Sequence, residues 1–337
     1  MNTRKLKKHL PASVISFLKK IQSIKLLKQL KVSYNYDLKR YSKHSDTLKT
    51  DSSSKLIGKI IRRYHVIEKG LTMPDTRLGF GKDRLIKLIE NCIDYVEKYG
   101  TEDIQIKHAI SVILEYEFFH RAMNFQLDDN LIYEINRVKN LEVTSNISEQ
   151  RKESKDSYFK YTNSSFKEFA LSRSSIRNFT EEEVSLDVIK NALELAQSAP
   201  SACNRQCWRT YVFTNKNKMN EILKVQGGNR GFGHLANKLI VIASDMSMFT
   251  NGDERNQVYV DGGIYAMNLL YALHYNNLAA CILNCSNSVE KDLKLRQMCQ
   301  IKDSEVFVAM IICGHPPENF KIAVSERYAL EVTNTIN

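Results

Sequence analysis

The spacing of apolar residues changes once along the chain, from a helical repeat to an alternation of strand-like and helical segments. This change is the strongest constraint on the fold. Before residue 140, apolar residues recur at helical spacing in segments near 55–69, 81–99, 103–122 and 127–139. Residues 140–165 are polar, and after them strand-like apolar runs alternate with helical segments. The sequence therefore predicts a helical N-terminal half and a helix-flanked sheet in the C-terminal half.

The alternation in the second half sets the expected order of elements. We expect helix 185–197, strand 209–214, helix 216–225, strand 238–244, helix 254–275, strand 279–284, helix 288–299 and strand 305–313. This order suits a sheet of α/β or α+β type, and periodicity does not decide which strands run parallel. We place three units along the chain, a basic helical segment (1–50), a helical extension (51–145) and a sheet domain (160–337).

Charge is concentrated at the N-terminus. Residues 1–50 hold 13 Lys and Arg against Asp37 and Asp46, so they account for the whole formal net charge of +11. The other 287 residues balance, as in an ordinary globular protein. Tyrosines lie near Lys39 and Arg40, but no known nucleic-acid-binding module surrounds them, so no nucleic-acid partner is expected.

Part of the basic segment is amphipathic. Five apolar residues share one helical face, namely Val14, Phe17, Leu18, Ile21 and Ile24. Lys25 and Lys28 then fall on that same face, so the pattern does not persist. A basic helix that touches an anionic membrane and a plain solvated or docking helix both remain open.

The seven cysteines are odd in number and form no CxxC pair, so we expect reduced thiols in a cytoplasmic protein. Two CxxxC spacings alone do not predict a metal site, and none is expected. The stretch from Gly262 to Val289 lacks formal charge, but four asparagines interrupt it. It therefore predicts a buried helix and strand, not a membrane span.

The stretch RSSIRNF, residues 173–179, places Arg173 and Arg177 four apart around Ser174 and Ser175. Guanidinium groups and hydroxyls are the donors that hold phosphate oxygens best. A phosphate site is therefore the sharper interpretation, and an exposed pair of charges is the simpler one.

A second stretch, APSACNRQCW, ends a helix at Pro200 and presents Asn204 and Gln206 in a loop of small residues that includes Ser201. A side-chain amide offers a donor and an acceptor together, which matches the edge of a planar heterocycle such as a flavin. A plain turn between helix and strand is the alternative.

Two further stretches stand out. The last strand runs into Cys313-Gly-His-Pro-Pro317, and a basic, aromatic tail with Arg327 follows. In the first half, HVIEKG places His65 and Glu68 three apart on one helical face, followed by Lys69. A substrate role is conceivable there, but a local hydrogen-bonded pair at a helix end is favoured.

Taken in order, these motifs resemble the FMN-dependent nitroreductase-like oxidoreductases over roughly residues 160–330. The resemblance rests on Arg173, Ser175 and Arg177; Pro200, Ser201, Asn204 and Gln206; Asp261-Gly262-Gly263 at the start of a long helix; and Gly314, Pro316 and Arg327. It implies an α+β nitroreductase-like fold, a mostly antiparallel sheet flanked by helices, here with an N-terminal helical region.

The resemblance also implies a cofactor site. Arg173, Ser174 and Ser175 would hold the phosphate and ribityl part of FMN, and Arg327 would close on the phosphate from the tail. Arg177 would lie by the N1/O2 edge of the ring.

The second loop would complete this site. Asn204 would address the N5/O4 side, while Pro200 and Ser201 shape the loop that also carries Gln206. No side chain is assigned a catalytic role, because the cofactor carries the chemistry.

The function implied is ping-pong reduction of a small organic acceptor by NADH or NADPH, in a homodimer that holds FMN at the subunit interface. The tail would wrap onto the partner subunit. An FMN-dependent oxidase or dehydrogenase of a small substrate, and a non-catalytic scaffold or membrane-surface relative, are the alternatives. The expected location is the cytoplasm, with peripheral membrane contact through residues 1–50 left open.

This chain departs from the family in two ways that bear on the site. Ser325 stands where many relatives have a second basic residue, which predicts weaker phosphate affinity. The helical extension resembles longer members associated with surface-polysaccharide gene sets. We expect that extension to cover a shallow flavin cleft and to narrow the range of acceptors.

Overall fold

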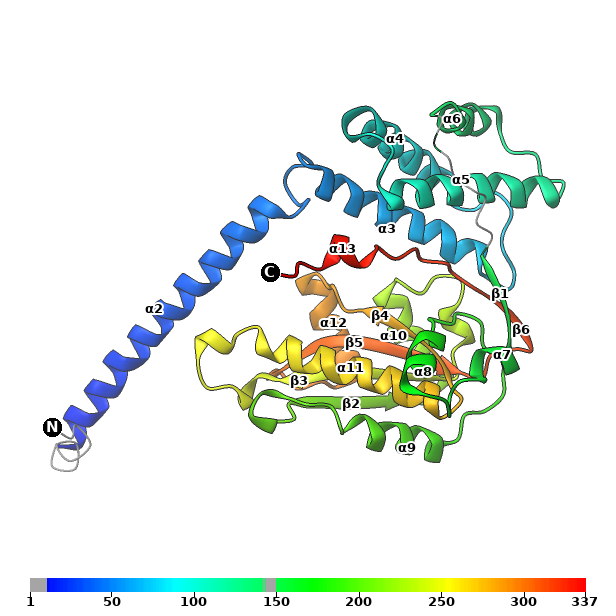
Figure 1. The fold of residues 1–337 in the computed structure, drawn as a ribbon. Coiled ribbons are helices and arrows are strands. Elements are labelled where there is room, and N and C mark those ends of the chain that lie inside the picture. The colour runs from blue at the N-terminus through cyan, green and yellow to red at the C-terminus, as the bar shows by residue number, and fades with distance from the viewer. Residues whose placement is uncertain (1–10, 142, 144–149) are drawn as a thin grey trace.

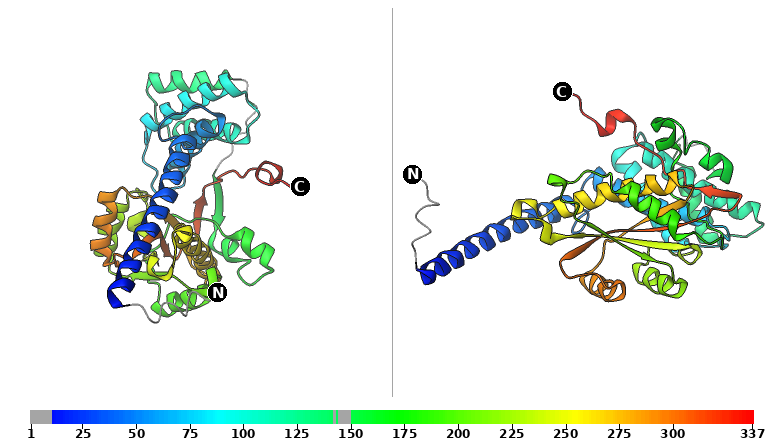
Figure 2. Two further views of the ribbon diagram at one scale, coloured as in Figure 1. Left: turned by 90° about the vertical axis from the view of Figure 1, so that its left-hand side faces the viewer. Right: turned by 90° about the horizontal axis from the view of Figure 1, so that it is seen from below.

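The computed structural model describes residues 11–141, 143 and 150–337. It shows a helical block beside a sheet domain, with one long helix projecting from them as an arm (Figures 1 and 2). This arm is α2, Ala12–His44, none of whose residues is buried. The first ten residues of the predicted basic segment, and most of the predicted boundary near 145, lie outside the described residues.

The helical block forms because four amphipathic helices bury their apolar faces against one another. They are α3 (Ser53–Leu71), α4 (Lys82–Tyr99), α5 (Ile104–Ala122) and α6 (Asp129–Lys139). Ser52, Asp103 and Asp128 cap α3, α5 and α6 by accepting backbone N–H groups of the first turn. The helices share a core of their own, separate from the cores of the sheet domain, and they confirm the four segments predicted from periodicity.

The sheet domain is built on four antiparallel strands in the order β2-β3-β5-β4. They are β2 (Trp208–Phe213), β3 (Lys238–Asp245), β4 (Ala279–Asn284) and β5 (Glu305–Gly314). Every residue of β3 is buried, as its continuous apolar run predicts for a central strand. The antiparallel pairing decides between the two predicted sheet types in favour of α+β.

Helices cover both faces of this sheet. The helices α9 (Leu186–Ala196) and α11 (Gln257–Tyr275) pack on one face, where Ile240 and Ile242 of β3 point. The helices α10 (Lys216–Gln226) and α12 (Val289–Cys299) pack on the other, against the alternate residues of the same strand. All four helices lie within one to three residues of their predicted bounds.

The long helix α11 lies unusually close to the sheet at one point. A Cβ on Gly262 would come within 2.5 Å of both Ser244 Oγ and Val308 Cγ2, closer than any side chain tolerates. The next residue, Gly263, faces open space. The first glycine of the Asp-Gly-Gly sequence is therefore required by packing inside the protomer, whereas the second lies on the outer face of the helix.

Several short elements were not predicted. A second, two-stranded antiparallel sheet joins β1 (Arg151–Ser154) to β6 (Asn319–Ile322), and α7 (Lys155–Phe159), α8 (Phe166–Ser172) and α13 (Leu330–Thr333) are short helices. Within the described residues, no helix combines the length and the apolar character needed to cross a membrane.

Candidate functional site

The backbone of the predicted phosphate segment is fixed by its neighbours. Arg173 follows α8 directly, and the Ile176 N–H donates to the Ala280 carbonyl at the start of β4 (3.0 Å). The Tyr158 hydroxyl donates to the Ser174 carbonyl (2.8 Å), and Arg151 donates to the Ser174 hydroxyl (3.1 Å). The segment is thus held along the edge strand of the sheet, which leaves its two arginines to face a ligand.

Three cations act electrostatically on the buried thiol of Cys281 in β4. Burial raises the pKa of this thiol, while Arg177, Lys69 and Arg173 oppose that shift. Within residues 11–141 and 150–337, none of the three cations forms an ion pair with a carboxylate. Cations gathered without a counter-charge repel one another, so this arrangement is suited to an anionic ligand.

Arg177 carries the clearest sign of such a ligand. Its side chain is buried (8% exposed), and its Nε has no hydrogen-bond partner in the described structure. Its guanidinium lies over the ring of Phe232, 5.9 Å from the ring centroid. A buried guanidinium donor without a partner is costly, and an anionic edge of a cofactor would satisfy it.

Ser172 and His274 join this segment to the C-terminal end of α11. The Ser172 hydroxyl lies 2.8 Å from His274 Nε2. Burial, and next the nearby Arg173, lower the pKa of His274 to about 4, so its imidazole is neutral near pH 7. It adds no further positive charge to the site and serves to position α8.

The loop of Pro200, Ser201, Asn204 and Gln206 lies at the other end of α11. The Ala202 N–H donates to the carboxylate of Asp261 (3.2 Å), and the Gln206 N–H donates to the Ser201 hydroxyl (2.9 Å). Asn204 and Gln206 have positive φ angles, 53° and 48°, which non-glycine residues rarely adopt. Both side chains are exposed, so the loop is held in a strained shape that presents its amides outward.

These two halves of the predicted site do not meet within one chain. Asp261 anchors the loop and His274 anchors the phosphate segment, and they are 13 residues apart on one helix. At a rise of about 1.5 Å per residue, the anchors are separated by about 20 Å. A single chain therefore presents the two halves at opposite ends of α11.

The outer face of α11 is apolar and exposed along the length of the helix. Tyr259, Val260, Ile264, Met267 and Tyr275 are each between 37% and 51% exposed. Gly263 lies on the same face with open space above it. Apolar residues in one continuous stripe on a central helix are typical of a surface that another protein covers.

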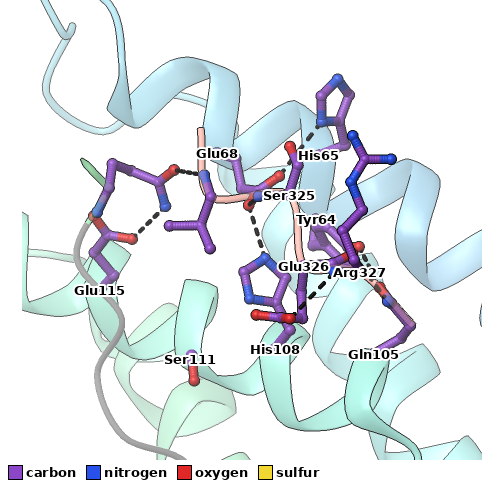
Figure 3. A network of polar contacts seen from close by, with 12 residues as sticks. Tyr64, His65, Glu68, Gln105, His108, Ser111, Glu115, Ser325, Glu326 and Arg327 are labelled. Carbon is purple, nitrogen blue, oxygen red and sulfur yellow. Dashed lines mark hydrogen bonds and ion pairs between the residues drawn. The ribbon is translucent and has the colours of Figure 1, made fainter. Parts of the chain in front are cut away.

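The C-terminal tail is held by the helical block (Figure 3). Ser325 donates its N–H to Glu68 of α3 (3.1 Å), and Gln105 of α5 donates its side-chain amide to the Glu326 carbonyl (3.2 Å). Arg327 is exposed and lies near His65 and Gln105. No hydrogen bond or ion pair of the described structure joins it to Arg173 or Arg177.

Glu68 is the centre of this network and is fully buried. Burial alone would raise the pKa of its carboxyl, but hydrogen bonds from His108 (2.8 Å), His65 (3.4 Å) and the Ser325 N–H outweigh that and lower it to about 2. The local pair of His65 and Glu68 favoured from the sequence is present. Its long-range partners, His108 and the tail, could not be read from the sequence.

The family of the sheet domain follows from comparison. Residues 170–228 and 224–315 match the model of the Nitroreductase family. This domain belongs to the nitroreductase family. The match confirms the resemblance seen in the motifs and the α+β class of the nitroreductase-family domain, and the helical block lies outside the matched range.

Solved structures give weaker likenesses. A nitroreductase-family protein from Streptococcus pneumoniae is 20% identical with a TM-score of 0.45, over 51% of this chain and 100% of that one. An FMN-dependent nitroreductase from Clostridium difficile is 23% identical with a TM-score of 0.41, over 49% and 92%. A protein from Desulfovibrio desulfuricans solved with FMN is 24% identical with a TM-score of 0.44, over 50% and 94%. No curated protein matches the chain, so the family assignment rests on the family model.

Two expectations concern the cysteines. All seven are free, as expected from their odd number and the absence of a CxxC pair, and five of them are buried. The described residues contain no group of three or more His, Cys, Asp or Glu side chains placed to hold a metal ion.

One member of the cation cluster was missed by sequence reasoning. Lys69 was grouped with His65 and Glu68 at the end of a helix, and nothing in its spacing pointed to Arg177, 108 residues later. The only available signal was that Lys69 directly follows Glu68 of the buried face of α3, near the end of the helix.

The buried carboxylate makes a prediction about stability. Because the folded pKa of Glu68 lies below the ordinary value of 4.5, its contribution is present above pH 4.5 and is lost as pH falls towards 2. We expect Glu68→Gln to lower the free energy of unfolding by about 3 kcal/mol at pH 7, because it breaks a buried, paired charge. Urea unfolding at pH 7 and at pH 3 measures this, and the difference between the variant and the wild type should shrink at pH 3. An equal difference at both pH values would contradict the assignment.

Proposed function

We propose that the chain is an FMN-dependent oxidoreductase that accepts electrons from NADH or NADPH and passes them to a small organic acceptor in a ping-pong cycle. The observation that carries the proposal is the cluster of Arg173, Arg177 and Lys69, which lack carboxylate partners in the described structure, with the buried Nε of Arg177 unpartnered. Two of these cations stand at positions that hold FMN in the nitroreductase family. Bound FMN would supply the two-electron chemistry.

The residues of the chain bind and orient in this proposal, and none acts as an acid or base. Arg173, Ser174 and Ser175 would hold the phosphate, on a backbone that Tyr158 and β4 keep in place. Arg177 would face the ring edge that gains negative charge on reduction, where a fixed cation in a buried site is most effective. The neutral His274 leaves the charge of the site to the arginines and Lys69.

The proposal includes a homodimer with the site shared between subunits. The loop of Pro200, Ser201, Asn204 and Gln206 lies about 20 Å from the phosphate segment along α11, farther than one cofactor ring reaches from its phosphate. A twofold axis across the exposed apolar face of α11 would bring the loop of one subunit towards the phosphate segment of the other. The proposal also has Arg327 of the partner's tail act at the site; within its own chain the tail segment just before Arg327 is held by α3 and α5.

The proposal also covers the electron acceptor, the location of the enzyme and its metabolic context. An oxidase, in which oxygen takes the electrons from the flavin, uses the same site and is the alternative. We place the enzyme in the cytoplasm because its cysteines are free. The link to surface-polysaccharide metabolism rests on the sequence resemblance of the helical extension alone.

Absorbance spectroscopy tests this proposal. The purified protein, supplied with FMN if colourless, should show bands near about 370 and 450 nm, which are those of bound flavin. Anaerobic NADH or NADPH should bleach them. Arg173→Gln should weaken FMN binding by about tenfold or more, because one charge-assisted phosphate contact is lost. Arg121→Gln, which changes an exposed arginine of the helical block, is the matched control.

Two outcomes would count against the proposal. A wild-type protein that binds no FMN would overturn it. Bound flavin that neither nicotinamide reduces, but that a small substrate reduces and oxygen reoxidises, would favour the oxidase.

We also propose that α2 makes a weak contact with an anionic membrane surface. The helix carries eight Lys and Arg against the single acidic residue Asp37, which is already paired with Arg255 (2.6 Å). Its five apolar residues from Val14 to Ile24 share one face and are between 38% and 63% exposed. Leu30, on another face of the helix, packs on Gly252 of the sheet domain. A basic helix with an exposed apolar face is the chemistry that anionic lipid attracts.

Vesicle co-sedimentation tests the contact. We expect binding to phosphatidylglycerol vesicles at low salt, little binding to phosphatidylcholine vesicles, and loss of binding in a Phe17→Ser, Ile21→Ser double variant. Leu38→Ser, which changes an equally exposed apolar residue of α2 on a different face, should bind as the wild type does. Equal sedimentation of wild type and double variant would sink the idea.

A further inference from the structure

Lys69 belongs to the helical block but lies at the site of the nitroreductase-family domain. It stands near the end of α3, and its Nζ donates to the carbonyl of Gly228 in the loop after α10 (3.3 Å). Its side chain is partly buried, and no carboxylate of the described residues pairs with it. The helical block thus places an ammonium group across the boundary between the two parts of the chain.

The end of α3 is fixed against this loop. Met73 Sδ lies 3.4 Å from where a Cβ on Gly231 would stand, and Gly231 itself has a φ of 86°. Gln226, the last residue of α10 before this loop, donates to the carbonyl of Asn284 at the end of β4 (3.0 Å). Lys69 is therefore held at a defined position beside β4 and not on a free helix end.

The neighbours of Lys69 are positive. Burial lowers the pKa of its ammonium group, and Arg177 lowers this pKa further. Arg84 has a smaller effect in the same direction, and the Cys281 thiol has the opposite effect. A long bond to a single carbonyl leaves most of the donor capacity of an ammonium group unused. Placing Lys69 next to Arg177 without a carboxylate is unfavourable unless an anion binds between them.

We propose that Lys69 is a cofactor-site residue supplied by the helical block, and that it acts with Arg177 on the edge of FMN that becomes negative on reduction. This inference rests on the proposed function. It gives the helical block a chemical role, since α3 would contribute a cation to bind the cofactor and to stabilise its reduced form. A lysine that only joins α3 to the loop would need the hydrogen bond to Gly228 and not the charge.

Three variants separate these roles. Lys69→Gln keeps a hydrogen-bond donor for the Gly228 carbonyl but loses the charge, and Lys69→Arg keeps the charge. Arg62→Gln, an exposed position on the same helix, removes one positive charge away from the site. FMN affinity is measured by quenching of flavin fluorescence, and the midpoint potential of bound FMN by an anaerobic dye-linked titration.

We expect Lys69→Gln to raise the dissociation constant of FMN about tenfold, and to lower the midpoint potential, because one buried cation facing the anionic edge is lost. Lys69→Arg and Arg62→Gln should resemble the wild type in both measurements. Circular dichroism and thermal unfolding check that each variant is folded.

The contradicting results are distinct. If the wild type binds FMN and Lys69→Gln matches it in affinity and midpoint potential, the inference is wrong and the proposed function stands. The same conclusion follows if Lys69→Gln changes only the KM for the acceptor. If the wild type binds no FMN, the proposed function itself fails. If Lys69→Gln does not fold, Lys69→Met takes its place in both measurements, because it keeps the length of the side chain and loses the charge; unchanged affinity and potential would again contradict the inference.

Discussion

The close packing of α11 on the central sheet is the constraint on which the rest of the site depends. Gly262 lets the helix approach β3 and β5 so closely that no side chain would fit between them. With its axis fixed in this way, α11 presents Asp261 at one end and His274 at the other. Each of these residues holds one half of the proposed cofactor site by a hydrogen bond. The distance between the halves is then set by the length of the helix.

The helical block adds a second constraint, on the C-terminal tail. The ionised carboxyl of Glu68 is stabilised by three hydrogen-bond donors, which come from α3, α5 and the tail. Glu68 therefore joins segments that are far apart in the sequence. Directly after Glu68, Lys69 points towards the nitroreductase-family domain. Two adjacent residues of one helix thus serve two purposes, since one anchors the tail and the other places a positive charge beside Arg177.

Local structure followed from the sequence where periodicity and caps agree. The helices of the block are predicted within a few residues because Ser52, Asp103 and Asp128 mark their starts and their apolar faces repeat regularly. The length of α2 was not predicted. The apolar residues of α2 before Lys25 lie on one face of the helix. The residues that contact the sheet domain, such as Leu30 and Asp37, lie on another face. No proline or glycine interrupts the helix between them.

The site was predictable only in part. The sequence pointed to Arg173, Ser174, Ser175, Arg177 and the loop from Pro200 to Gln206 as a candidate site because their residue types suit phosphate and a heterocycle edge; their role stays a prediction. The pairing of β1 with β6 joins four-residue strands more than 160 residues apart, and the approach of Lys69 to Arg177 joins two domains. Neither leaves a periodic signal, because each depends on how complete elements pack.

Subunit complementation tests most directly the central claim that the two ends of α11 serve two different sites. Arg173→Gln breaks the phosphate half and Asn204→Asp breaks the loop half, and each variant alone should bind little FMN at a concentration just sufficient to fill the wild-type sites. Co-expressed in equal amounts, they should recover about one quarter of the wild-type FMN sites, because half of the dimers are mixed and each mixed dimer has one intact site. No recovery in demonstrably mixed dimers would mean that both halves of a site come from one chain, and the account would be wrong.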